Sequence, residues 1–160
     1  MSHPSYIRAS LLDRLIDTEP QQHTELRPLR GYTRTELYAA LRRDLAWLLN
    51  TRCGFSIATL TSRQRTVIDY GIPDFGTFYS ENEEDWARLQ EILEQSIRAY
   101  EPRLQEIRVH LERLEYKDYR CIGGTLEATL KIANIHEPLA FQLLIEPKNA
   151  WKISLSDWPT

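Results

Sequence analysis

Apolar residues recur every three or four positions in two long stretches of this chain, which predicts two amphipathic helices. The first helix is expected over residues 34–50, because Thr33 and Glu36 form a capping box at its start. The second is expected over residues 81–100, because Pro102 disfavours helical geometry at the residue before it. The apolar faces consist of Leu37, Leu41, Leu45 and Leu48 in the first helix, and of Trp86, Leu89, Leu93, Ile97 and Tyr100 in the second.

After residue 103 the apolar residues alternate with polar ones, which is typical of strands that bury one face. Strands are expected over residues 107–112, 126–133, 139–145 and 151–155. Residues 134–138 are few enough to form a hairpin loop between the second and third strands. Together the patterns predict an α+β fold, in which two main helices pack on one face of a three- to four-stranded antiparallel sheet.

Residues 1–30 are expected to form an N-terminal arm, and residues 31–160 a single domain. The arm carries an apolar stripe at helical spacing, made of Ile7, Leu11, Leu12, Leu15 and Ile16. Since a helix of about two turns is not stable alone in water, we expect the stripe to dock, either on its own domain or on a partner. Residues 55–80 show no clear period and are expected to be mostly irregular.

The composition is that of an ordinary folded protein. The 160 residues are 42% hydrophobic and 27% charged, which is enough for one domain with a core. The net charge of −3, with basic residues scattered among acids, argues against a nucleic-acid partner. Residues 1–10 lack the apolar segment of a signal peptide, and no apolar run could span a bilayer. The isolated Cys53 and Cys121 fit a reducing, cytoplasmic location without membrane insertion.

Residues that could carry catalysis do not form a known motif. Gly123 and Gly124 are followed by a strand pattern rather than by a helix with a lysine, which excludes a phosphate-binding loop. Cys53 has no histidine placed beside it by the sequence, so a small buried side chain is the better interpretation. The histidines are far apart and are expected to be solvated, with His110 on a strand and His136 in a turn; the others are His3 and His23.

An acidic cluster at residues 81–85 could supply the two carboxylates of a glycoside hydrolase. A general acid needs a raised pKa, whereas the start of a helix stabilises the charged form of a carboxylate. Capping and solubility therefore explain the cluster better, and we expect no enzyme, no metal and no cofactor. The members of the cluster are Glu81, Glu83, Glu84 and Asp85.

The tripeptide Glu101-Pro102-Arg103 lies at the junction of the second helix and the sheet. We expect the proline to stiffen this corner, Arg103 to project from it, and Glu101 to orient the guanidinium. An arginine presented in this way is a good anchor for a protein interface. The alternative is an ordinary helix stop with a surface ion pair, worth about 0–1 kcal/mol.

Four segments occur in a characteristic order: Ser10–Leu15, Leu41–Arg52, Tyr70–Phe75 and Tyr100–Leu104. Together they resemble the TssE family of type VI secretion, which is related to the lysozyme-like wedge protein of contractile phage baseplates. The resemblance covers nearly the whole chain, and the second and fourth segments are the most specific.

The resemblance implies a structural subunit of a cytoplasmic baseplate that contains TssF, TssG and TssK. It implies that the Glu-Pro-Arg motif, here Glu101, Pro102 and Arg103, inserts into the core of the wedge. It also implies that the sheet pairs with strands of the first sheath ring, made of TssB and TssC, by β-augmentation. Two other functions stay open, a peptidoglycan-cleaving muramidase and a generic adaptor that binds peptides at its sheet edge.

Overall fold

The structure is a computed structural model in which the chain forms two compact units. Helix α2, Arg34–Asn50, spans the boundary between them. The first unit is Met1–Leu41 and the second is Arg42–Thr160. The residues that the structure describes are 7–16, 20–21, 31–75, 83–116, 119–132, 135–146 and 151–157.

In the first unit, strand β1, Ile7–Arg8, pairs antiparallel with strand β2, Gly31–Tyr32. Helix α1 covers only Leu11–Leu15, so the prediction that Ile7 belongs to a helical stripe is wrong. Ser10 is the reason, because its side chain accepts a hydrogen bond from the Asp13 N–H and thereby starts the helix after Ile7. The other four stripe residues are 49–73% exposed: Leu11, Leu12, Leu15 and Ile16.

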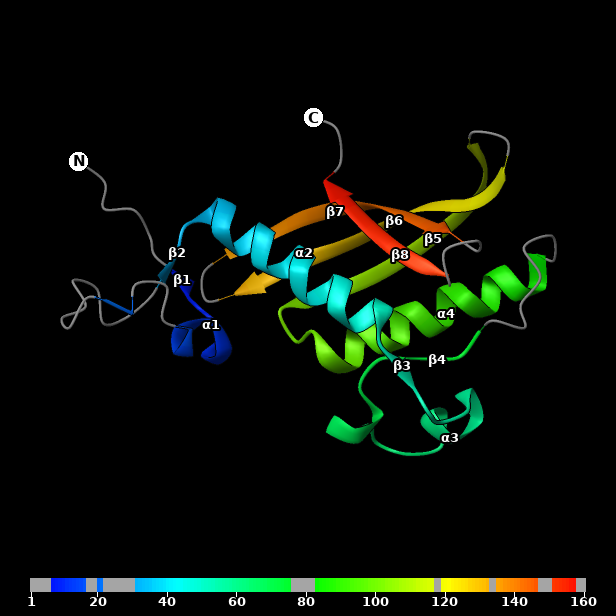
Figure 1. Cartoon of the computed structure of the whole chain (residues 1–160), viewed down its shortest axis with the longest axis horizontal. Helices are drawn as coiled ribbons and strands as arrows, with labels where there is room; N and C mark the ends of the chain where they lie inside the picture. Colours follow the sequence, from blue (N-terminus) through cyan, green and yellow to red (C-terminus); the bar gives the residue numbers. More distant parts are fainter. Residues whose placement is uncertain are drawn as a thin grey trace. The chain divides into compact units, whose positions relative to one another are not determined.

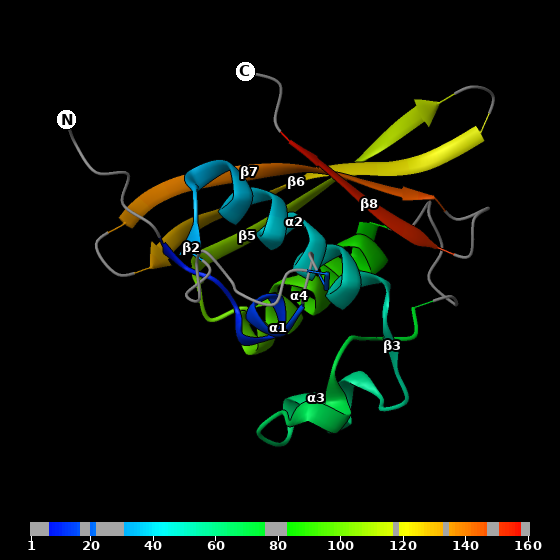
Figure 2. The same cartoon turned by 60° about the vertical axis from the view of Figure 1, so that its left-hand side comes forward.

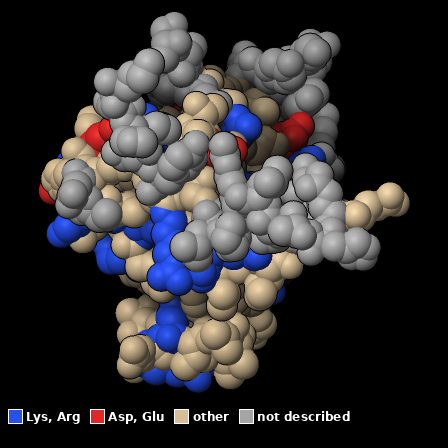
Figure 3. Space-filling model, turned by 90° about the vertical axis from the view of Figure 1, so that its left-hand side faces the viewer, with Lys and Arg blue, Asp and Glu red and all other residues tan. Residues whose placement is uncertain are grey.

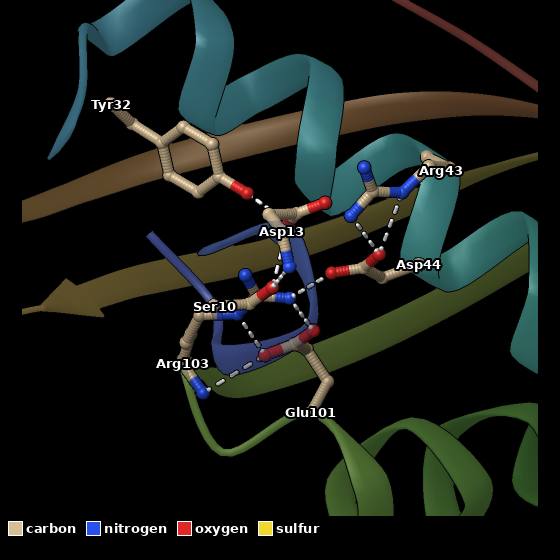
Figure 4. Close-up of polar contacts among 7 residues, drawn as sticks. All are labelled: Ser10, Asp13, Tyr32, Arg43, Asp44, Glu101 and Arg103. Carbon is tan, nitrogen blue, oxygen red and sulfur yellow. Dashed lines mark hydrogen bonds and ion pairs between the residues drawn. The ribbon is translucent and has the colours of Figure 1, made fainter. Parts of the chain in front are cut away.

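A buried carboxylate connects α1 to β2 within the first unit (Figure 4). Asp13 accepts a hydrogen bond from the Ser10 hydroxyl at 2.6 Å and another from the Tyr32 hydroxyl. Since a buried carboxylate is costly without hydrogen-bond donors, these two contacts stabilise the short helix against the strand.

Helix α2 begins and ends as predicted. The Thr33 N–H donates to Glu36 Oε2 at 2.7 Å, and the Glu36 N–H donates to Thr33 Oγ1 at 3.3 Å, which confirms the capping box. The predicted leucine face is buried, with at most 2% exposure for Leu37, Leu41, Leu45 and Leu48.

The second unit contains a four-stranded antiparallel sheet in the order β5-β6-β7-β8 (Figure 1). Its strands are β5, Leu104–Tyr116; β6, Tyr119–Ile132; β7, Ile135–Glu146; and β8, Lys152–Asp157. The prediction of an α+β fold with an antiparallel sheet is therefore confirmed.

The hairpin loop predicted at residues 134–138 is wrong, because Ile135 and the residues after it already belong to β7. Pro138 lies opposite Thr129 of β6, in a part of β7 that β8 does not reach, since the β7–β8 pairing starts at Phe141. A proline is tolerated in such an edge stretch, where its missing N–H breaks no hydrogen bond of the sheet.

Strand β6 is longer than predicted and includes Gly123 and Gly124 in its interior. Gly124 pairs with Leu111 of β5, and a Cβ atom at this glycine would lie 2.2 Å from the His110 carbonyl oxygen. The glycine therefore allows a close approach of two backbones within the sheet.

Helix α4, Glu83–Tyr100, and the second part of α2 lie on one face of the sheet (Figures 1 and 2). α4 ends at the predicted residue, whereas the predicted start at residue 81 lies outside the described residues. The core-facing strand positions alternate as predicted, and the paired Val109, Leu126 and Phe141 are at most 5% exposed.

Residues between α2 and α4 are more regular than predicted. Ser56 caps a short helix by accepting a hydrogen bond from the Thr59 N–H at 3.3 Å. Sequence periodicity cannot detect such an element, because a single turn repeats no apolar position. The elements are β3, Arg52–Cys53; α3, Ile57–Thr61; the 3-10 helix η1, Val67–Asp69; and β4, Ile72–Pro73, which pairs parallel with β3.

Candidate partner-binding site

The backbone around Pro102 forms a tight corner between α4 and β5. The Leu104 N–H donates to the Glu101 carbonyl oxygen at 3.1 Å, which closes a turn over the proline. The Arg103 carbonyl oxygen accepts a hydrogen bond from the Lys131 N–H at 2.8 Å, so the backbone of this arginine is already attached to β6. The corner predicted at the junction of helix and sheet is therefore present.

The Arg103 side chain does not project freely from this corner, contrary to the prediction (Figure 4). Its Nε donates to Glu101 Oε1 at 2.6 Å, and its Nη2 donates to Asp44 Oδ2 on α2 at 2.7 Å and also to Glu101 Oε2. Glu101 is only 5% exposed, and a carboxylate this buried requires a compensating charge. Glu101 orients the guanidinium, as expected, but it does so by holding the side chain against the domain.

These contacts keep the guanidinium of Arg103 in its positively charged form. Burial alone would lower the pKa of Arg103, but the hydrogen bonds and charges of Glu101 and then Asp44 outweigh it and raise the pKa above its usual value. The side chain keeps 22% of its surface exposed. Nε and Nη2 are occupied, whereas Nη1 has no hydrogen-bond partner among the described residues. The two N–H groups of Nη1 are thus held in a fixed orientation.

Asp44 connects this cluster to an exposed tryptophan on the next turn of α2. Arg43 donates to Asp44 Oδ1 through Nη2 at 2.8 Å, and its guanidinium lies over the Trp47 ring at 5.0 Å from the centroid. Trp47 is 51% exposed. An exposed tryptophan next to ordered arginines is typical of protein interfaces.

A second exposed aromatic residue lies near the same carboxylates. Tyr70 is 37% exposed and packs edge-to-face against Tyr100, with ring centroids 5.3 Å apart. Burial, followed by the negative charges of Asp44 and Glu101, raises the pKa of the Tyr70 hydroxyl. Since Tyr100 directly precedes Glu101 in the chain, the ring contact with Tyr100 places Tyr70 beside the corner that carries Arg103. We call this region the Arg103 surface, and it consists of Arg43, Asp44, Trp47, Tyr70, Glu101 and Arg103.

The lobe around α3 and η1 carries basic charge and two exposed apolar residues. Residues 52–69 contain three arginines and one acid, the buried Asp69, and the lobe at the bottom of Figure 3 shows basic but no acidic side chains on the visible face. Val67 and Ile68 of η1 are 87% and 68% exposed. Arg65 anchors the lobe to α4 by donating to the hydroxyl of the buried Ser96 at 2.9 Å.

Sequence reasoning identified Glu101 and Arg103 but missed the rest of the Arg103 surface. Asp44 is the decisive partner, yet it is 59 residues away from Arg103 in the sequence, and nothing local indicates the contact. Trp47 did give a signal, because a tryptophan outside the leucine stripe of an amphipathic helix is unusual.

The other residues considered for chemistry lie in ordinary environments. Cys53 and Cys121 are buried free thiols, as the sequence predicted for Cys53. His110 and His136 are exposed, and His136 lies in β7 rather than in the predicted turn.

Among the described residues, no group of three or more potential ligands is arranged to hold a metal ion. No helix in the described part of the chain is long and apolar enough to cross a membrane. His3, His23 and Glu81 lie outside the described residues.

An ordered arginine among exposed aromatic residues, on a small α+β domain, is typical of protein interfaces. The chain belongs to the family of the baseplate wedge protein gp25, whose family model matches residues 35–134, more than half of the chain. The four sequence segments indicated this same family. Its members are structural components of a baseplate, and so is this chain.

The chain is similar to one in a solved structure described as "The baseplate complex from the type VI secretion system". The TM-score is 0.47 and the sequence identity 19%, over 70% of this chain and 96% of that one. No curated protein matches this chain.

Proposed function

We propose that this chain is a TssE-type structural subunit of a type VI secretion baseplate, and that Arg103 attaches it to a wedge formed with TssF, TssG and TssK. The proposal rests above all on one observation, the fixed guanidinium whose Nη1 group has no partner among the described residues. The gp25 family match supports the baseplate role. The role is structural, cytoplasmic and independent of any cofactor.

The proposed mechanism depends on preorganisation. Because Glu101 and Asp44 already hold the guanidinium, a partner that binds Nη1 does not have to order a flexible arginine. A carboxylate or carbonyl group of the partner is the matching acceptor. Trp47 and Tyr70 then exclude water around this contact, as aromatic residues do around interface anchors.

The second part of the proposal concerns the sheath. The sheet is open and ends in two edge strands, β5 and β8. Edge strands carry backbone groups that a strand from another chain can complete. The subunit would therefore offer the first ring of TssB and TssC a template for strand pairing.

Replacing Arg103 by lysine tests the attachment to the wedge. Arg103→Lys keeps the positive charge but loses the planar fork that contacts Glu101, Asp44 and the partner together. We expect capture by immobilised TssF–TssG to fall about tenfold or more, with an unchanged circular dichroism spectrum. Arg88→Ala, which removes an exposed arginine of α4, serves as the control and should be captured normally. Undiminished capture of Arg103→Lys would contradict the proposed attachment.

Arg103→Ala is less informative by itself, because it leaves the buried Glu101 carboxylate without its main partner. We expect it to lower the free energy of unfolding by about 1–3 kcal/mol, a range that allows for the partial exposure of Arg103. Adding Glu101→Gln removes the buried charge and should restore part of that stability. If the double variant folds stably and is still not captured, the loss of binding comes from the guanidinium and not from unfolding.

A further inference from the structure

The backbone of η1 holds two apolar side chains at the surface of the lobe. Val67 and Ile68 are 87% and 68% exposed, and Val67 is the most exposed large apolar residue in the described part of the chain. The Asp69 N–H donates to the Thr66 carbonyl oxygen at 3.0 Å, and the Tyr70 N–H donates to the Val67 carbonyl oxygen at 3.3 Å. These hydrogen bonds close the turn around the two residues, which we call the η1 tip.

The η1 tip is attached to the same end of α4 that carries the Arg103 corner. The Tyr100 hydroxyl donates to the Thr66 carbonyl oxygen at 2.8 Å, directly before the tip. Arg65 Nη1 donates to the Ser96 hydroxyl at 2.9 Å, one turn earlier on α4. Since Tyr100 is followed at once by Glu101, the last turn of α4 positions both the tip and the Arg103 surface. The two features therefore belong to one continuous region.

The η1 tip has the properties of a preorganised apolar anchor. Single exposed apolar residues are normal on a protein surface, but an adjacent pair held outward by a closed turn is a different feature. Valine and isoleucine are branched at Cβ and have few side-chain rotamers. Because backbone and side chains are both restricted, little conformational entropy is lost when a partner buries them.

The basic charge of the lobe indicates the chemistry of the partner. Arg63 pairs with the buried Asp69, whereas Arg65 donates to a neutral hydroxyl and pairs with no carboxylate among the described residues. No acidic side chain is visible on this face of the lobe in Figure 3, although the net charge of the chain is −3. A carboxylate beside an apolar pocket would match both the charge and the apolar tip.

We propose that the η1 tip is a second anchor to the wedge, and that Val67 and Ile68 insert into an apolar pocket of the wedge with a carboxylate at its rim facing Arg65. The inference rests on the proposed attachment through Arg103, and it adds a separate contact to that attachment. One guanidinium contact fixes a point, whereas a second contact on the same rigid helix end also fixes the rotation of the subunit. Once Arg103 is bound, the tip is held close to its pocket, so the two contacts strengthen each other.

Making the η1 tip polar tests the apolar contact. The test variant combines Val67→Ser with Ile68→Ser, and the matched control combines Val67→Ile with Ile68→Val, which keeps the apolar character and the total volume. We expect immobilised TssF–TssG to capture the serine variant about tenfold or more weakly and the control like the wild type. Because both side chains are exposed, the urea midpoint should not change. Should the serine variant be less stable, Val67→Ser alone, at the more exposed position, takes its place.

Two variants of Arg65 test the carboxylate at the rim. Arg65→Lys keeps the charge, whereas Arg65→Gln loses it but keeps an N–H group for the Ser96 hydroxyl. We expect Arg65→Gln to be captured severalfold more weakly than Arg65→Lys, with a difference that shrinks as the salt concentration rises. Equal capture of the two variants at low salt would mean that no carboxylate of the wedge faces Arg65.

The outcomes separate the two proposals. If TssF–TssG does not capture the wild type, the attachment to the wedge fails and this inference fails with it. If Arg103→Lys loses capture but the serine variant does not, only the second anchor is wrong. Sedimentation and vesicle binding address the other occupants. A wild-type dimer that the serine variant does not form, or binding to phosphatidylglycerol vesicles that the serine variant loses, would assign the η1 tip to a second copy or to a lipid surface and overturn the inference.

Discussion

Asp69 is fully buried and holds the turn of η1 together. Its Oδ2 accepts hydrogen bonds from the N–H of Thr66 at 2.8 Å and from the hydroxyl of Thr66 at 3.0 Å, and its Oδ1 pairs with Arg63. The backbone hydrogen bond from Thr66 is the largest influence on the pKa of Asp69. It lowers this pKa, against the opposing effect of burial and with the help of Arg63 and Arg65.

The lowered pKa of Asp69 predicts a loss of stability in acid. The unfolded chain has an Asp pKa of about 3.9, above the folded value, so the contribution of Asp69 is complete above that pH and disappears as the pH falls through the folded pKa. We expect Asp69→Asn to be less stable than the wild type in urea at pH 7, with the difference shrinking below about pH 4. Glu112→Gln, at an exposed position of β5, is the control. A difference that stays constant from pH 7 to pH 3 would show that the charge of Asp69 contributes nothing.

At the scale of elements, the parallel pair of β3 and β4 connects the lobe to the end of α2. Gly71 precedes β4 with a φ angle of 111°, a conformation that side chains rarely allow. A Cβ atom at this position would lie 2.4 Å from the Thr51 carbonyl oxygen, which accepts the hydrogen bond of the Ile72 N–H. Glycine at residue 71 is therefore required for the pairing of β3 with β4, which positions the neighbouring Tyr70.

Gly71→Ala should destabilise the protein by about 1–3 kcal/mol, because it combines backbone strain with an overlap at a backbone atom. Gly54→Ala is the matched control, since a Cβ atom there meets no other atom within 4 Å. Urea unfolding curves of both variants check the prediction. Equal midpoints for the two alanine variants would mean that the β3–β4 pairing does not depend on Gly71.

At the scale of the whole molecule, a structural subunit should leave peptidoglycan intact. In the described structure, the carboxylates of Glu101 and Asp44 share one guanidinium, whereas a glycoside hydrolase needs two carboxylates that flank the sugar. We expect the full chain to cause no fall in the turbidity of a purified peptidoglycan suspension, with a muramidase as positive control. Clearing that disappears in Glu101→Gln would contradict a purely structural role.

The sequence alone determined the elements whose signals are local and repeated. A capping box and a leucine stripe predicted α2 to the residue, because both act within a few positions of the chain. Alternating apolar residues predicted the antiparallel sheet, and Pro102 predicted the end of α4 at Tyr100. The gp25 family likewise followed from short segments in a fixed order.

Only the tertiary structure decided how Arg103 is held and how the end of α2 contacts β8. The contact of Arg103 with Asp44 joins residues 59 positions apart, and that of Asn50 with Ile153 joins residues 103 positions apart. Such contacts leave no period or motif in the sequence, because they depend on how α2 packs against the sheet and the corner. Hydrogen-bonding capacity is a property of each residue, but whether it is satisfied within the chain or left for a partner depends on the folded neighbours.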